Sequence, residues 1–320
     1  NFLLNNFVNQ LKNLSSVKKK YPKLEIIVFN FPNILNSNYS YFDLKYDKII
    51  SKFNLQIEKI SKQLNFHFFD YNKLINFYGS SRVYDFRNYF LSKNLYTEEF
   101  SDKIAQELSK KVYSIFNVKK KCLVIDLDNT FWGGILGEDG IEALDIGKTY
   151  QGGGYSSFHN YLKMLLRQGV LLAITSKNNI WDVKECFQKL PDLSIKLNQF
   201  SSIKINWEPK FKNIKEISKE LNIGLDSMVF IDDSKFERDQ MKRFNPEVNV
   251  IEFPDSPLEI VNALEESCYF TQLNDLTDED KKKTNQYKII SRANRFKLNF
   301  QDSKGGIEKY LNSLKIKIFI

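Results

Sequence analysis

The chain has little histidine and little cysteine, and both are scattered. Its 320 residues include two histidines, His67 and His159, and three cysteines, Cys122, Cys186 and Cys268. Their spacing fits neither a zinc motif nor a disulfide framework. We therefore expect no histidine-based metal or triad chemistry, and the scattered spacing of the cysteines favours a reducing, cytoplasmic setting.

Long apolar runs are also missing. No stretch approaches the roughly 20 apolar residues that span a bilayer, and no charged-then-apolar leader opens the sequence as it stands. We expect no membrane segment. Residue 1 is Asn, and residues 314–320 resemble a strand that stops in mid-element, so we expect a fragment of a longer protein.

Charge is unbalanced toward the basic side, with a formal net charge of +8 and Lys runs at residues 18–20, 119–121 and 281–283. One interpretation is long-range attraction of an acidic protein partner. The interpretation that we favour is an ordinary solvated surface. No basic helix interleaved with aromatics accompanies these runs, so we expect no nucleic-acid binding.

One stretch, residues 121–140, KCLVIDLDNTFWGGILGEDG, combines a buried-strand pattern with two carboxylates and a glycine-rich loop. Residues two apart on a strand share a face, so Asp126 and Asp128 are expected to project together from the strand's carboxyl end. Such a pair repels itself unless a cation lies between the carboxylates or one keeps its proton. Alone, such a pair is more often a helix cap or a turn than a catalytic site.

Three later stretches also run from an apolar strand into polar groups. Residues 170–179 end on Thr175 and Ser176, residues 203–212 offer Lys210 at a helix start, and residues 228–234 end on Asp232 and Asp233. Lys210, judged by spacing alone, could also be a solvated surface lysine. Strands expected over residues 24–29, 66–69 and 248–253, alternating with helices that include residues 157–167, predict an α/β fold with a parallel sheet. The order carboxylate, hydroxyl, lysine, acidic pair resembles the four signature motifs of the haloacid dehalogenase (HAD) superfamily.

The fragments DLDNTFWGGILGEDG, LLAITSKNN, INWEPK and LNIGLDSMVFIDDSKFER together resemble the FkbH-like members of that superfamily, its subfamily IIIC phosphatases. The likeness covers roughly residues 120–295. It departs from the family pattern at Phe131, at Thr175 and in the triplet Gly152-Gly153-Gly154. The resemblance implies a HAD-like Rossmannoid parallel sheet. Too few residues separate the first and second motifs for an inserted cap domain, so we expect an uncapped, open site.

The resemblance also implies a role for each matching residue. Asp126 would be the nucleophile that forms an aspartyl-phosphate, and Asp128 the general acid and base. A Mg²⁺ ion would be held by Asp126, the Asp128 backbone carbonyl, Asp232 and Asp233. The phosphate would be bound by Ser176 and Lys210, with Thr175 beside them and with Asn178 and Trp132 as candidate substrate contacts.

Domain boundaries are expected near residues 118 and 270. Residues 1–118 distantly resemble a partial SGNH-hydrolase-like α/β domain, but Asp85 is followed at the catalytic spacing by Asn88 instead of histidine, so no base could activate a serine. We expect a non-catalytic domain in which Asp85 and Arg87 form a buried salt bridge. Residues 119–270 would form the HAD-like phosphatase domain. Residues 271–320 would form a helical connector and the start of a truncated acetyltransferase-like (GNAT-like) domain.

FkbH-like proteins dephosphorylate a glyceryl phosphate, apparently 1,3-bisphosphoglycerate, and load the glyceryl unit onto the phosphopantetheine arm of an acyl carrier protein in polyketide-type pathways. Other relatives lie near surface-polysaccharide genes. The first hypothesis is therefore a Mg²⁺-dependent phosphatase and glyceryltransferase with a carrier protein as partner. The alternatives are a simple phosphatase acting on a sugar phosphate or another small phosphoester, and a non-catalytic HAD scaffold.

Overall fold

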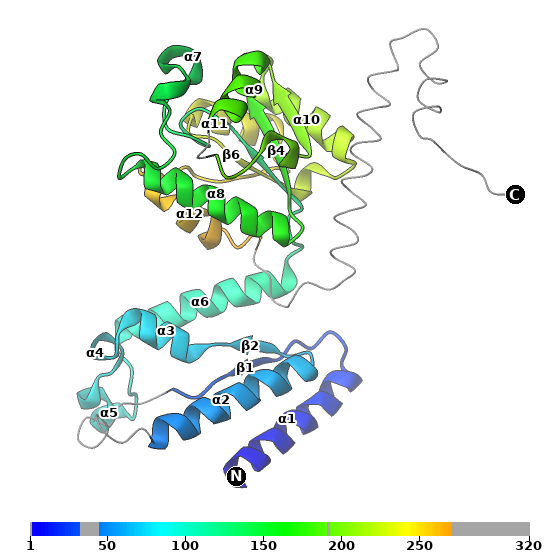
Figure 1. The fold of residues 1–320 in the computed structure, drawn as a ribbon. Helices are drawn as coiled ribbons and strands as arrows, with labels where there is room; N and C mark the ends of the chain where they lie inside the picture. The colour runs from blue at the N-terminus through cyan, green and yellow to red at the C-terminus, as the bar shows by residue number, and fades with distance from the viewer. Residues whose placement is uncertain (1, 33–44, 191–192, 271–320) are drawn as a thin grey trace, which may run out of the picture. The chain divides into compact units, whose positions relative to one another are not determined.

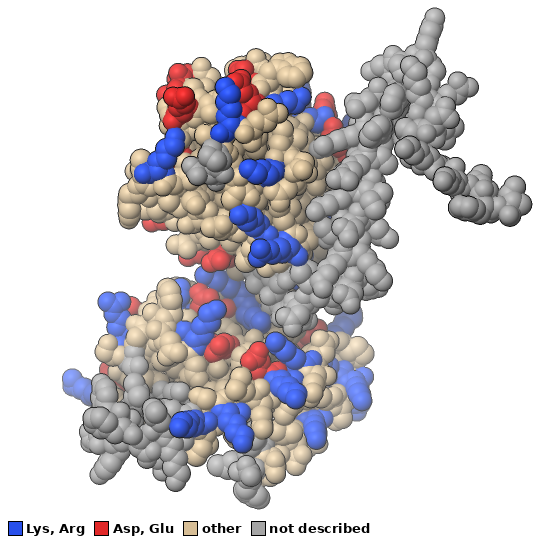
Figure 2. Space-filling model, in the orientation of Figure 1, with Lys and Arg blue, Asp and Glu red and all other residues tan. Residues whose placement is uncertain are grey.

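The computed structural model describes residues 2–32, 45–190 and 193–270, in two compact units, Asn1–Asn117 and Val118–Ile320 (Figure 1). The helix expected over residues 276–296 and the strand expected over 315–320 lie outside the described residues. On the face drawn in Figure 2, basic side chains are scattered among acidic and uncharged ones, which agrees with a solvated surface. No helix among the described residues is long and apolar enough to cross a membrane.

The first unit combines a small parallel sheet with helices. Strands β1 (Ile27–Phe29) and β2 (His67–Phe69) pair in parallel, as their apolar runs predict. The helices are α1 (Phe2–Lys20), α2 (Lys45–Gln63), α3 (Tyr71–Tyr78), α4 (Ser80–Val83), α5 (Phe86–Ser92) and α6 (Glu98–Phe116). Each of the two strands ends in a polar residue, Asn30 or Asp70, and these side chains hydrogen-bond to each other.

The expected buried salt bridge between Asp85 and Arg87 is wrong. Asp85 is the N-cap of α5, and its carboxylate accepts hydrogen bonds from the backbone N–H groups of Arg87 and Asn88 at 2.9 and 3.1 Å. Arg87 is exposed. A short aspartate side chain that follows an extended residue satisfies the free donors of a helix start, and this local role takes precedence over pairing with the next basic residue.

The second unit contains a five-stranded parallel sheet in the order β5-β4-β3-β6-β7. Its strands are β3 (Cys122–Ile125), β4 (Leu171–Ser176), β5 (Ser202–Ile205), β6 (Met228–Ile231) and β7 (Asn249–Val250). The helices are α7 (Leu136–Asp139), α8 (Gly152–Arg167), α9 (Ile180–Lys189), α10 (Lys210–Leu221), α11 (Lys235–Phe244) and α12 (Ile260–Glu266), with short 3₁₀ turns between them.

The apolar run of β3 occupies the centre of this sheet and is buried on both faces. Leu123 and Ile125 belong to the core under α8, α9 and α12, whereas Cys122 and Val124 belong to the core under α10 and α11. A continuous apolar strand is what a parallel sheet with helices on both faces requires. The expectation that Cys122 is a packing residue is therefore confirmed, and burial raises the pKa of its thiol.

The helix boundaries differ from expectation at the glycine triplet. Helix α8 begins at Gly152 and not near residue 157. A Cβ on Gly152 would collide with the Asp145 carboxylate, and one on Gly154 would collide with the backbone of Pro257. The triplet thus forms a helical turn that packs too closely for side chains. Between β3 and β4, a segment described throughout, there are only α7, a 3₁₀ turn and α8. No cap domain is inserted there.

Candidate active site

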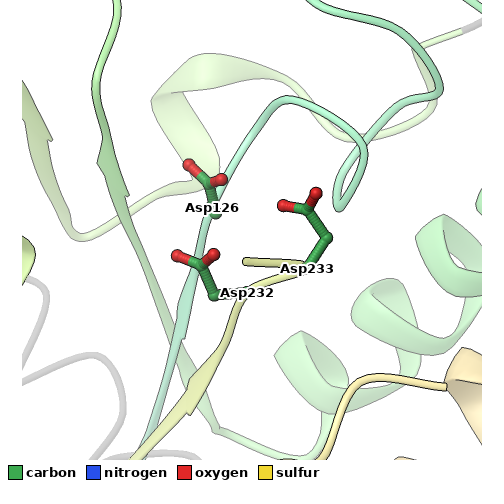
Figure 3. A group of neighbouring side chains, drawn as sticks. All are labelled: Asp126, Asp232 and Asp233. Carbon is green, nitrogen blue, oxygen red and sulfur yellow. The ribbon is translucent and has the colours of Figure 1, made fainter. Parts of the chain in front are cut away.

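Three carboxylates meet at the carboxyl edge of the sheet (Figure 3). Ile125 and Ile231 are the last paired residues of β3 and β6, so the next residues, Asp126 and Asp232, lie side by side. One oxygen from each of Asp126, Asp232 and Asp233 lies within 4.8 Å of the others. Of the acidic residues that the sequence predicts for one site, the structure brings these three together.

Lys210 is a buried member of this site and not a solvated surface lysine. It is the first residue of α10, after Pro209, and its Nζ lies 2.9 Å from Asp126 Oδ2 and 2.7 Å from Asp232 Oδ2. Burial alone would lower the pKa of Lys210, but the two carboxylates more than offset it and raise the pKa. Lys210 is therefore an ammonium that pairs with both carboxylates.

The negative charges exceed what Lys210 neutralises. Burial, together with the charge of Asp126, raises the pKa of Asp232 to about 7 and also raises the pKa of Asp233. Asp126 is 5% exposed, and among the described residues its Oδ1 has no hydrogen-bond partner. Buried polar atoms are rarely left unpaired, so this oxygen indicates a partner that the protein does not supply. Three carboxylates around one space fit a hard divalent cation such as Mg²⁺.

The Asp128 side chain is held away from this group. Its Oδ1 accepts hydrogen bonds from Trp132 Nε1 at 3.0 Å and the Leu136 N–H at 3.1 Å, and its Oδ2 accepts one from Asn178 Nδ2 at 2.8 Å. The sequence predicts that the carboxylates of Asp126 and Asp128 project together. In the structure the carboxylate that pairs with Asp126 at the metal site is that of Asp232, and the Asp128 side chain is not part of this pair. Three donors orient the Asp128 carboxylate beside the site.

The two residues guessed as substrate contacts instead surround Asp128. Trp132 is fully buried and uses its only polar atom on Asp128. Asn178, also buried, donates to Asp128 and weakly, at 3.5 Å, to Ser176 Oγ. The contacts of both residues position Asp128. From the sequence, a tryptophan in a glycine-rich loop is expected at the surface. In the folded loop the Trp132 indole is buried.

The two hydroxyls at the end of β4 have different surroundings. Thr175 is fully buried, and its Oγ1 accepts a hydrogen bond from Asn213 of α10 at 3.3 Å. Ser176, one residue later on the strand, lies near Asn178. Because successive side chains on a strand point to opposite faces, Thr175 and Ser176 face different surroundings. The contacts place Thr175 in the packing against α10.

The turn after β3 is held by its own polar residues, as the sequence indicates. Asn129 has a left-handed backbone, with φ of 52°, and its side chain accepts a hydrogen bond from the Gly134 N–H at 3.0 Å. Thr130 Oγ1 accepts a hydrogen bond from the Asp233 N–H at 2.9 Å. These contacts join the loop after β3 to the loop after β6, so both acidic segments keep a fixed spacing.

Sequence reasoning missed Arg238. This buried residue of α11 donates from Nη1 to the backbone carbonyls of Asp232 at 2.9 Å and Asp233 at 2.7 Å. It also missed the ion pair of 2.6 Å between Lys177 and Glu237. The sequence held a signal, because all three residues lie inside the quoted fragments LLAITSKNN and LNIGLDSMVFIDDSKFER, but charged residues there resemble those of a solvated surface.

The second unit is a parallel α/β sheet with acidic groups at the end of its central strand, which agrees with the α/β fold class expected from the sequence. Among solved structures, the chain is similar to the N-terminal part of protein BF1531 from Bacteroides fragilis, described as containing a phosphatase domain complexed with Mg. The identity is 29% and the TM-score 0.70, covering 85% of this chain and 74% of that chain.

Other matches are much weaker. Two structures of a HAD family enzyme from Bacteroides thetaiotaomicron, with magnesium or with magnesium and inorganic phosphate, have identities of 14% and 15% and TM-scores of 0.31 and 0.30. They cover 44% and 43% of this chain and 95% of their own, and likeness at this level supports no inference. No family model and no curated protein matches the chain.

Proposed function

We propose that this protein is a Mg²⁺-dependent phosphatase or phosphotransferase that works through a phosphorylated Asp126. The observation that carries the proposal is the buried, unpartnered oxygen of Asp126 among Asp232, Asp233 and Lys210. A structural carboxylate would use both oxygens in hydrogen bonds. The phosphatase domain with Mg in the similar Bacteroides protein supports the same chemistry.

Asp126, Asp232 and Asp233 would hold the cation, together with the backbone carbonyl of Asp128. When bound, Mg²⁺ offsets the repulsion between an anionic nucleophile and an anionic phosphate. Lys210 already pairs with Asp126 and Asp232, so it orients the nucleophile and adds a second positive charge. Ser176, at the end of the adjacent strand, would donate its O–H to a phosphoryl oxygen.

In the first step, a carboxylate oxygen of Asp126 forms a bond to phosphorus while the bond to the leaving oxygen breaks. Asp128 would give that oxygen its proton. In the second step, the deprotonated Asp128 takes a proton from water as the water attacks phosphorus and frees Asp126. The three donors around Asp128 keep one carboxyl group oriented for both transfers.

The substrate class comes from the FkbH-like resemblance. We infer a glyceryl phosphate such as 1,3-bisphosphoglycerate. Asp126 would remove its ester phosphate, and the phosphopantetheine thiol of an acyl carrier protein would attack the acyl carbon, so that the acyl phosphate leaves as inorganic phosphate and a thioester forms. The absence of a cap insertion between β3 and β4 supports access by a long pantetheine arm. In this proposal the first unit is an SGNH-like, non-catalytic domain, the residues beyond 270 lead into a GNAT-like domain, and the protein works in the cytoplasm.

A simple phosphatase acting on a small phosphoester is the second candidate. It is favoured by the phosphatase domain of the similar Bacteroides protein. A non-catalytic scaffold is disfavoured, because burying repelling carboxylates with an unpartnered oxygen costs stability that a scaffold has no reason to retain.

The test is phosphate release from 1,3-bisphosphoglycerate with Mg²⁺, with and without a phosphopantetheinylated carrier protein whose mass is followed. A glyceryl mass gain that disappears in Asp126→Asn supports the transferase. Phosphate release with an unchanged carrier mass supports the simple phosphatase. If neither this compound nor a panel of phosphoesters releases phosphate with Mg²⁺, the scaffold is the better description.

A further inference from the structure

An ion pair spans the carboxyl edge of the sheet above the nucleophile. Lys177 follows Ser176 directly after β4, and Glu237 lies in the first turn of α11, which follows β6. Strands β4 and β6 are the two neighbours of β3, the strand that ends at Asp126. Neighbouring strands are about 4.8 Å apart, so a contact between groups following β4 and β6 must cross the end of β3.

The two partners differ in exposure. The Glu237 side chain is 7% exposed and that of Lys177 is 38% exposed, with Lys177 Nζ 2.6 Å from Glu237 Oε1. An ammonium has three donors. In the described part of the chain, Glu237 occupies one of them. The Glu237 carboxylate is thus held in place by burial, whereas the Lys177 ammonium is open to solvent.

The reaction described above gives a role to Lys210 and none to Lys177. Lys210, which is buried, is committed to Asp126 and Asp232, whereas Lys177 follows the residue whose hydroxyl we assign to the phosphoryl group. A phosphoryl group at Asp126 would thus lie at the same edge of the sheet as the bridge, where the rest of the substrate can reach the Lys177 ammonium. A lysine there meets whatever is attached to the phosphoryl group.

We propose that Lys177, held by Glu237, is a binding subsite for a second anionic group of the substrate, a carboxylate or a further phosphate. This inference rests on the proposed function, since it assumes a phosphoryl group at Asp126. It narrows the substrate class to compounds with two anionic ends. Lys177 would give its remaining donors to the second anion, and Glu237 would keep the lysine stem across the edge of the sheet.

The test compares two phosphoesters that differ in one group. Glycerol 3-phosphate ends in a hydroxymethyl group, where 3-phosphoglycerate has a carboxylate. With Mg²⁺, the wild-type protein is expected to show a higher kcat/KM for 3-phosphoglycerate, mainly through KM. Lys177→Met should reduce this preference about tenfold, the worth of a hydrogen bond to a charged group. Calorimetric binding of 3-phosphoglycerate to Asp126→Asn, with and without Lys177→Met, should show the same loss.

Two further variants keep the result interpretable. Lys177→Met leaves the buried Glu237 carboxylate unpaired, so the double variant Lys177→Met/Glu237→Gln removes both ends and should lose the same preference. Lys184→Met removes an exposed charge from α9, where the ammonium lies 4.4 Å from the Trp181 ring centroid, and should keep the preference.

An unchanged preference in the single and double variants would overturn the subsite, as would an equal loss in Lys184→Met, because that result would reflect only long-range charge. If the wild type releases phosphate from both esters without preferring the doubly anionic one, the subsite is wrong and the phosphatase stands. If Mg²⁺ yields no phosphate from either ester, nor from 1,3-bisphosphoglycerate or the panel of phosphoesters, the proposed function falls and this inference falls with it.

Discussion

Arg238 shows how a residue outside the reaction can determine the geometry of the site. One nitrogen of its guanidinium is shared between the carbonyls of Asp232 and Asp233, so it fixes the turn that carries two of the three carboxylates. Partners that orient ligands in this way typically change metal affinity by about 10–100-fold when removed. The position of these carboxylates thus depends on a side chain that the reaction does not use.

We therefore expect Arg238→Met to weaken Mg²⁺ binding by about tenfold, measured by calorimetry in the absence of substrate. Arg243→Met is the matched control, since Arg243 is on the same helix but exposed, and its affinity for Mg²⁺ should match that of the wild type. Equal affinities in the two variants would show that the turn holds its shape without Arg238.

At the residue scale, the sequence predicts the acidic group and Lys210 because strand ends in a parallel sheet share one edge. It does not predict what surrounds them. Trp132 and Thr175 read as substrate contacts from their place in the motifs, yet both are buried and bonded to protein groups. The direction of a side chain in a loop depends on tertiary packing, which a spacing rule does not contain.

At the scale of elements, the start of α8 depends on three glycines in different surroundings. A Cβ on Gly153 would meet nothing within 4 Å, whereas one on Gly154 would collide with the Pro257 backbone. Gly153→Ala should raise the free energy of unfolding by up to about 1 kcal/mol through helix propensity. Gly154→Ala should lower it by about 1–3 kcal/mol through overpacking.

Both values can be measured by denaturant unfolding followed through tryptophan fluorescence. The three tryptophans, Trp132, Trp181 and Trp207, all belong to the second unit, so the signal reports on that unit. If the two substitutions change stability by the same amount, close packing is not the reason for the triplet.

The element order could be read from the sequence, and most ends of helices and strands fall within a few residues of expectation. The larger differences have local causes. Strand β7 is only Asn249–Val250 instead of the predicted residues 248–253, since a strand at the sheet edge pairs on one side only. Helix α8 begins five residues early because close packing favours glycine at a position where propensity argues against it.

At the scale of the whole molecule, a buried histidine makes the stability of the second unit depend on pH. His159, on α8, has Nε2 2.8 Å from the Phe131 carbonyl oxygen, and its buried Nδ1 has no hydrogen-bond partner in the part of the chain that the structure describes. Burial lowers the pKa of His159 to about 4. Between pH 4 and about 6.5, the usual value, the unfolded state binds more protons than the folded state. Stability is thus full above that range and falls as the pH drops through it.

His159→Gln should therefore lose part of this dependence. We expect the difference in unfolding free energy between wild type and His159→Gln to shrink by about 2 kcal/mol between pH 7.5 and pH 4.5. Titrating carboxylates common to both proteins cancel in that difference. Tryptophan fluorescence in denaturant measures it at each pH. A difference that stays constant across this range would mean that His159 can be protonated in the folded protein.

The division into two units and the α/β class of the second unit follow from alternating strand and helix patterns over the whole chain. The site follows from the same topology, since four strand ends meet along one edge. What such patterns cannot supply is the identity of the substrate, because they describe the elements that carry the reacting groups and not the side chains around the rest of the substrate.

The most direct test of the central claim is to trap the phosphorylated protein. The wild type is mixed with Mg²⁺ and 3-phosphoglycerate, the doubly anionic phosphoester, and the reaction is quenched in acid within one turnover. The protein is then digested, and the masses of its peptides are measured. We predict the added mass of one phosphoryl group on the peptide that contains Asp126, and none in Asp126→Asn. Phosphate release without such a peptide, or a phosphoryl group on Ser176 instead, would contradict the account.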